Sequence, residues 1–132
     1  MRKSVIINII IITLFLIIIC IYEDVVVTGG VRKVNEDCMA IEELIESIED
    51  DIRTMEVVMA VENLEYEWKQ NESRMCYLVN HKSIQEIGVE ISKLQGFLEN
   101  NELNDFKSSL DAIKFYSHSY LHFMGASLHN IL

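Results

Sequence analysis

The sequence predicts an all-α protein in which an N-terminal transmembrane helix is followed by a small antiparallel up-down bundle of four helices. Three observations lead to this fold class. Residues 5–22 contain no charged side chain, the later segments repeat apolar residues at intervals of three and four, and the 132 residues include no proline and only 5 glycines. Proline and glycine are the usual residues of turns, so their scarcity favours a few helices with short connections.

Residues 5–22 are long enough to cross a bilayer. At about 1.5 Å per residue they form a helix of about 27 Å, close to the thickness of the hydrocarbon layer. Basic residues precede this segment at positions 2 and 3, and acidic residues follow it at positions 23 and 24. The positive-inside rule therefore predicts a cytoplasmic tip at residues 1–4 and an extracytoplasmic domain after the span.

The same segment is expected to be retained as an uncleaved signal anchor in the cell membrane, crossing it once. It exceeds the apolar core of a cleavable signal peptide, and no site of small residues follows it directly. Residues 23–31 are expected to form a juxtamembrane stalk, in which Gly29 and Gly30 are the first place where the chain can bend. The sequence leaves open whether the anchor helix hinges there or continues as a rigid stalk.

The extracytoplasmic bundle is expected to comprise residues 32–132. Its first helix has an apolar stripe with heptad spacing and is expected to end near Asp51, and the second follows a tight turn with Thr54 as its N-cap. The third and fourth helices are separated by a turn at residues 99–101. The core expected from the four stripes consists of Ile41, Ile45, Ile48, Val61, Leu64, Trp68, Ile87, Ile91, Leu94, Phe106, Leu110 and Ile113.

The end of the fourth helix is less regular. Past Tyr116 its apolar residues spread around the helix, and Gly125 offers an end or a kink. The sequence leaves open whether this helix is unbroken past Ser119. Because the third helix is shorter, the fourth is expected to overhang toward the membrane.

The charge is unevenly distributed. The net charge is −10, and residues 23–67 hold 14 acidic and 3 basic residues. Such a negative surface argues against binding of nucleic acid and of anionic lipid. The densest acidic group lies at the membrane-distal tip and is the candidate surface for a protein partner: Glu42, Glu43, Glu46, Glu49, Asp50 and Asp51. A solvated helix face and weak cation binding are the alternatives.

No residue is expected to be catalytic or to bind a cofactor, so the protein is not expected to be an enzyme. His118 and His122 lie four residues apart on one helical face, and helix pairing puts His81 at a similar height, so the three are candidate ligands of zinc or copper. The competing interpretation places His118 and His122 at the polar membrane interface. Cys38 is expected to be a small core residue, and no disulfide is expected with Cys76, about 14 Å further along the hairpin.

Several features together make the chain resemble the domain of unknown function 4363 family of Gram-positive bacteria. They are the basic tip with an Ile-rich anchor, the acidic first hairpin, Glu67-Trp68, His81-Lys82-Ser83-Ile84 and the ending Asn130-Ile131-Leu132. Many members carry a proline near the position of Leu121, and this sequence lacks it, so the fourth helix is free to continue. The resemblance implies a membrane-anchored helical protein and no established chemistry.

The expected function is that of a non-enzymatic protein-interaction or accessory module for a membrane or cell-envelope partner. Self-association through the anchor and stalk would make it a homo-oligomer. The alternative is an extracytoplasmic bundle that senses or binds a ligand or cation and works through a separate membrane partner, since the sequence shows no second span and no cytoplasmic output domain.

Overall fold

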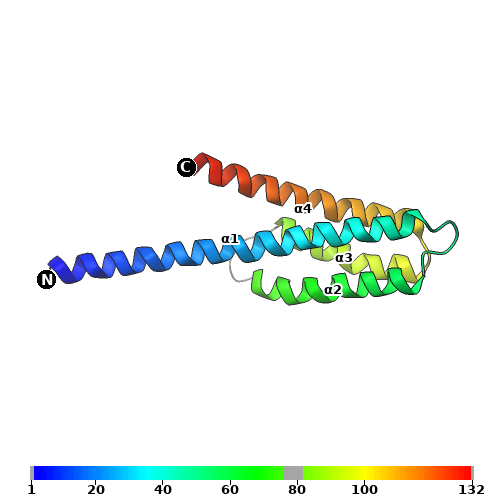
Figure 1. Cartoon of the computed structure of the whole chain (residues 1–132), viewed down its shortest axis with the longest axis horizontal. Helices are drawn as coiled ribbons and strands as arrows, with labels where there is room; N and C mark the ends of the chain where they lie inside the picture. Colours follow the sequence, from blue (N-terminus) through cyan, green and yellow to red (C-terminus); the bar gives the residue numbers. More distant parts are fainter. Residues whose placement is uncertain (1, 76–81, 132) are drawn as a thin grey trace.

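The protein consists of four helices joined by short connections. The computed structural model describes residues 2–75 and 82–131, with side chains for 2–75 and 82–123. The helices are α1 (Arg2–Glu46), α2 (Met55–Met75), α3 (Lys82–Glu99) and α4 (Leu103–Ile131), and α1 extends far beyond the others at its N-terminal end (Figure 1). No strand occurs in these ranges, so the predicted all-α class is confirmed.

The anchor segment and the first helix of the bundle are one continuous helix of 45 residues. Both Gly29 and Gly30 lie inside it, so the chain does not hinge at this pair. A Cβ atom on Gly30 would overlap with Cε of Met75 on α2, whereas nothing lies within 4 Å of the same point on Gly29. Gly30 therefore marks a close approach between α1 and α2.

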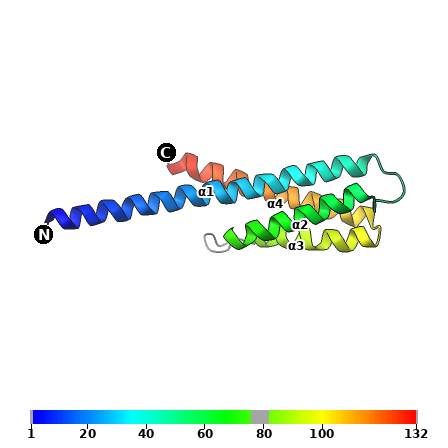
Figure 2. The ribbon, with the colours of Figure 1, turned by 60° about the horizontal axis from the view of Figure 1, so that its bottom comes forward.

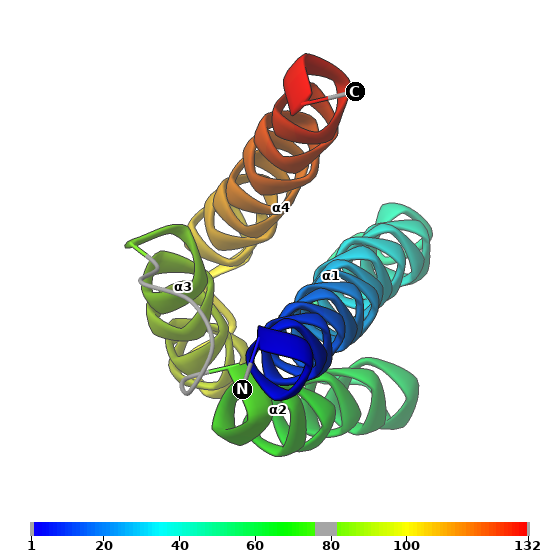
Figure 3. The same ribbon diagram turned by 90° about the vertical axis from the view of Figure 1, so that its left-hand side faces the viewer.

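The helices form a four-membered antiparallel bundle. Seen along its length, α1 lies between α2 and α4, and α3 stands on the opposite side (Figure 3). Turning the molecule keeps α2 and α3 together at the C-terminal half of α1 (Figure 2). Among the described residues α3 packs most extensively on α4, and the pairing of α2 with α3 is the least extensive of the four.

The core follows one stripe of each helix. Eleven of the twelve residues expected in the core are buried, and Ile48 is partly buried and packs against them. Val27 and Val31 are also completely buried, so α1 joins the core within the stalk segment. Burying a large apolar side chain contributes about 1.5–3 kcal/mol, and this continuous stripe holds α1 to the bundle.

The N-terminal part of α1 lies outside this core. It contains an 18-residue window of mean hydropathy 3.2, and none of that window is buried. By length and composition, α1 could cross a membrane as a single span. It is the one helix in the described part of the chain with these properties.

The first bundle helix ends earlier than the sequence suggested, at Glu46 rather than near Asp51. The connection that follows is tied to the other distal turn by Asn101. Its Nδ2 donates to the carbonyl oxygen of Asp50 at 3.2 Å, and its Oδ1 accepts from the backbone N–H of Ile52 at 3.0 Å. Those two backbone groups are held by Asn101 instead of by helical bonds. Ile52 still reaches the core and is 1% exposed.

Asn101 also ends α3. Its φ of 55° is left-handed, a conformation that asparagine tolerates better than most residues. The N–H of Glu102 donates to the carbonyl of Phe97 at 2.8 Å, and that of Asn101 donates to Leu98 at 3.1 Å. This pair of bonds is the Schellman motif, which satisfies carbonyls that the helix end would leave without donors.

The fourth helix is unbroken past Ser119 and runs on to Ile131, so Gly125 neither ends nor interrupts it. With 29 residues against 18 in α3, α4 overhangs its neighbour toward the N-terminal part of α1.

The two adjacent glycines should respond in opposite directions to the same substitution. Gly29→Leu removes a flexible residue from an exposed helix position, so the free energy of unfolding should rise by about 0.5–1 kcal/mol. Gly30→Leu forces a side chain into the space of Met75, so the free energy of unfolding should fall by about 1–3 kcal/mol. Urea unfolding of the full chain in detergent micelles, followed by circular dichroism, measures both. Equal effects would contradict the close approach of α1 and α2.

Substitutions at Asn101 should separate its backbone conformation from its hydrogen bonds. Asn101→Gly keeps the left-handed conformation but loses the two bonds to the other turn, each worth about 0.5–1.5 kcal/mol. Asn101→Ala loses the same bonds and adds a conformational cost of about 1–2 kcal/mol. The same unfolding assay should therefore rank wild type above the glycine variant and the glycine variant above the alanine variant. A glycine variant as stable as wild type would show that the bonds between the two turns contribute nothing.

Candidate functional site

The acidic tip is partly engaged by the protein's own cations. Glu42 accepts a hydrogen bond from Nζ of Lys114 on α4, which raises the pKa of that lysine. Asp51 pairs with Arg53, whose Nη2 lies 2.7 Å from Oδ2. The side-chain hydrogen bond from Arg53 is the main reason that the pKa of Asp51 falls to about 2, so this carboxylate stays charged except in strong acid.

The other four carboxylates of the predicted partner surface are exposed to solvent. They are Glu43, Glu46, Glu49 and Asp50. No ion pair within the described residues involves any of them. Within those residues, no group of three or more His, Cys, Asp or Glu side chains is arranged to hold a metal ion. The tip is therefore an open negative surface rather than a pocket.

The candidate metal ligands are only partly brought together. The rings of His118 and His122 stack with their centroids 6.4 Å apart, and both side chains are exposed on α4. His81 lies outside the described residues, as does Cys76. Cys38 is buried with a free thiol, and burial is the main reason that its pKa rises to about 12. A thiol with that pKa is protonated at neutral pH and is a poor nucleophile.

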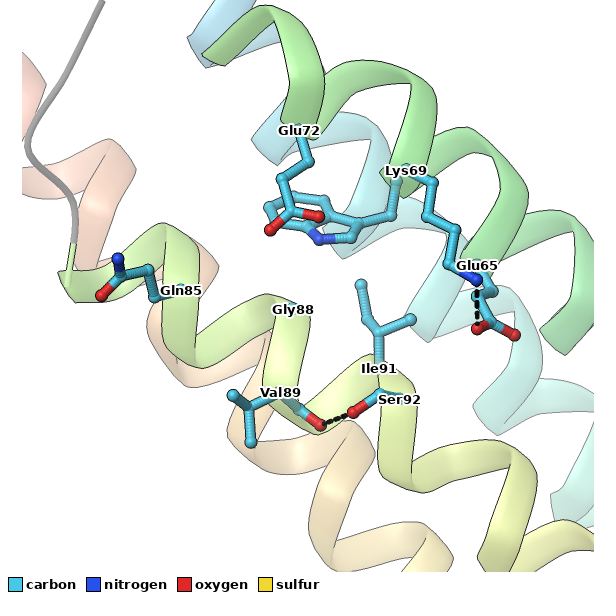
Figure 4. Close-up of a pocket in the computed structure, with 9 residues that line it drawn as sticks. Glu65, Lys69, Glu72, Gln85, Gly88, Val89, Ile91 and Ser92 are labelled. Carbon is cyan, nitrogen blue, oxygen red and sulfur yellow. Dashed lines mark hydrogen bonds and ion pairs between the residues drawn. The ribbon is translucent and has the colours of Figure 1, made fainter. Parts of the chain in front are cut away.

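A groove between α2 and α3 was not anticipated from the sequence. It encloses about 530 Å³ at the least extensive of the four helix pairings. Figure 4 shows side chains of the two helices facing each other across it. Its lining residues are Glu65, Trp68, Lys69 and Glu72 from α2, and Gln85, Gly88, Val89, Ile91 and Ser92 from α3.

A glycine keeps the middle of this groove open. A Cβ atom on Gly88 would lie 3.1 Å from Nε1 of Trp68 and 3.4 Å from Oε1 of Glu72. The indole nitrogen and the carboxylate therefore converge on one point that no side chain fills. The sequence signal was a glycine inside a helix, which costs about 1 kcal/mol relative to alanine unless a close contact uses the space.

Two polar groups of the groove have no partner in the part of the chain described here. Trp68 is 2% exposed, and its Nε1 is buried without a hydrogen-bond acceptor. Glu72 makes no ion pair, whereas its neighbour Glu65 lies 2.9 Å from Nζ of Lys69. A buried donor without a partner costs about 1–3 kcal/mol, so this indole N–H lowers the stability of the wall of the groove.

Comparison with known proteins places the bundle in a family. The family described as Domain of unknown function (DUF4363) matches residues 28–131. That range covers the bundle and begins after the apolar anchor segment. No curated protein and no solved structure matches the chain.

Substitutions at Trp68 should show whether its N–H is unpaired in the folded protein. Trp68→Ala should lower the free energy of unfolding by about 3–5 kcal/mol, because it empties a large volume of the core. Trp68→Phe should cost much less, since it keeps an aromatic ring and removes a donor whose burial costs about 1–3 kcal/mol. Urea unfolding in detergent measures the difference. If both variants are equally destabilised, the N–H has a partner in the native state.

Proposed function

The chain belongs to the domain of unknown function 4363 family, and on this basis we propose that it is a membrane-anchored, non-enzymatic module that binds a protein of the membrane or cell envelope. The anchor is residues 5–22, the N-terminus with Arg2 and Lys3 is cytoplasmic, and the bundle is extracytoplasmic. The exposed apolar start of α1 and the match over the bundle support this division.

The groove between α2 and α3 is the observation that carries the proposal. It combines apolar side chains, Val89 and Ile91, with a donor on Trp68 and the carboxylate of Glu72, neither of which has a partner among the described residues. Its occupant is a segment of the partner protein that contributes apolar side chains and a basic side chain for Glu72. Pairing of that kind gives specificity as well as affinity.

The exposed carboxylates of the tip complement this role. A negative surface at the membrane-distal end attracts a partner with a positive surface over distances of about 10 Å at moderate salt. The 24 residues from Glu23 to Glu46 in α1 correspond to about 36 Å, so the tip stands well clear of the headgroups. Charge at the tip steers the encounter, and the groove makes the contact.

Site-specific photocrosslinking in native membranes tests the proposal. A photoreactive residue at Val89, which is 49% exposed in the groove, should crosslink to a membrane or envelope protein. The control position is Tyr66, which is 64% exposed and lies outside the groove lining. Introducing Glu72→Gln should abolish the Val89 product, because it removes the charge and keeps the shape of the side chain.

Three results would contradict the proposal: the same products from both positions, no product from either, or a Val89 product that survives Glu72→Gln. A Val89 product that contains a second copy of the chain would identify the partner as the protein itself. Labelling of a Phe115→Cys variant by an impermeant thiol reagent added outside intact cells tests the orientation, and protection from it would place the bundle inside.

A small ligand in the same groove is the second candidate, and the function would then be that of a sensing bundle coupled to a separate membrane partner. The volume of about 530 Å³ favours it, since sites for small molecules usually enclose about 300–1,000 Å³. Trp68 is the single tryptophan in the chain, so its fluorescence reports directly on the groove. A change in emission with a low-mass fraction of cell extract, absent in Glu72→Gln, would favour sensing over protein binding.

A further inference from the structure

The C-terminal part of α4 reaches the level of the anchor. α1 ends at Glu46 and α4 begins at Leu103 at the same distal end of the bundle, and from there both helices run back toward the membrane side. Counting equal helical rises, Phe123 comes about level with residue 26 of α1, and Ile131 with about residue 18. In Figures 1 and 2 the end of α4 reaches the level of the blue part of α1, beyond the ends of α2 and α3.

Two interactions between α1 and α4 bracket this register, one on its distal side and one on the side of the anchor. Side chains of a helix lean toward its N-terminus, so Glu42 and Lys114 on antiparallel helices lean toward each other and can pair from different heights. Further along, Tyr120 is close enough to the carboxylates of Glu23 and Asp24 for them to raise its pKa, in addition to the larger effect of burial. The chain of α4 beyond Tyr120 therefore continues past the outer end of the anchor segment.

The end of α4 also separates from α1. The end view shows the C-terminal turns of α4 directed away from α1 rather than packed along it (Figure 3). Phe123 is 72% exposed. The last residue with a formal charge is Lys114, so the 18 residues that follow contain no Asp, Glu, Lys or Arg. An exposed, uncharged helix end with aromatic and histidine residues is typical of the membrane–water interface.

We propose that the last three turns of α4, residues 121–131, enter the membrane that holds the anchor through its phospholipid headgroup layer and form a second attachment to it. The headgroup layer extends about 5–8 Å beyond the hydrocarbon core on each side, and Phe123 stands about 6 Å beyond the level of Tyr22. The occupant of this helix surface is lipid because its height coincides with that layer and because the segment carries no charge that lipid would have to desolvate. The inference rests on the membrane anchor of the proposed function.

Two matched tryptophan variants of the full chain in phospholipid vesicles provide the test. Phe123→Trp places a fluorophore at the proposed contact. Phe115→Trp places one at a residue of the same type and similar exposure, 67%, on the same helix about 12 Å farther from the membrane. Both substitutions exchange one exposed aromatic ring for another, so neither threatens folding. Wild type supplies the signal of Trp68 for subtraction.

Vesicles are made with phospholipids brominated on the upper acyl chain, which quench nearby tryptophans. We expect loss of most of the added fluorescence for Phe123→Trp and none for Phe115→Trp. Equal quenching of the two variants would overturn the inference. Protection of Phe123→Trp from both lipid bromine and aqueous iodide would overturn it as well, because a protein surface would then cover the helix.

Flotation of the wild-type chain with the vesicles after alkaline extraction separates this inference from the proposed function. If the wild-type chain floats but the fluorescence of Phe123→Trp is not quenched, the membrane anchor holds and only the second attachment is refuted. A chain that does not float has no membrane anchor, and both proposals fail together.

Discussion

The single stripe of buried residues on α1 is the constraint on which the rest of the structure depends. Before Val27 the helix exposes apolar side chains on all sides, and from Val27 to Ile45 only one stripe is buried. A helix that is apolar all round requires a nonpolar environment, whereas a narrow stripe requires other helices. α2 and α4 pack against the two flanks of this stripe, and α3 closes the bundle by packing on α4. The change of pattern along α1 thus determines where the bundle begins.

Two ion pairs link α1 to its neighbours on either side, and they orient the helices more than they stabilise them. Lys33 lies 3.5 Å from Glu67 on α2, and Lys114 of α4 pairs with Glu42. All four side chains are partly exposed, and pairs of this kind contribute about 0–1 kcal/mol each. The cohesion of the bundle comes from the apolar stripe. The pairs favour the arrangement in which α2 and α4 flank α1.

The sequence predicted what depends on periodicity and missed what depends on distant contacts. The stripe of Ile41, Ile45 and their counterparts was readable because burial recurs at helical spacing. The continuity of α1 was not readable from the sequence, because a pair of glycines permits both a hinge and a helix. Gly30 contacts Met75, which is 45 positions further along the chain. The connection that follows α1 likewise depends on hydrogen bonds with Asn101, which is distant in the sequence. Of the candidate site, the acidic tip was visible in composition, but the groove exists only because α2 and α3 pack less extensively than the other pairs.

The uninterrupted α1 also fixes the angular position of the groove relative to the apolar segment, residues 5–22. In one rigid helix each residue turns the chain by about 100°, so each face of residues 5–22 has a fixed direction around the helix axis relative to the opening between α2 and α3. A partner helix that packs against one face of residues 5–22 would therefore always have the groove in the same direction around the axis of α1. Inserting a single residue into α1 between residue 22 and Val27 would rotate the groove by about 100° relative to residues 5–22. Every contact within the bundle would stay the same.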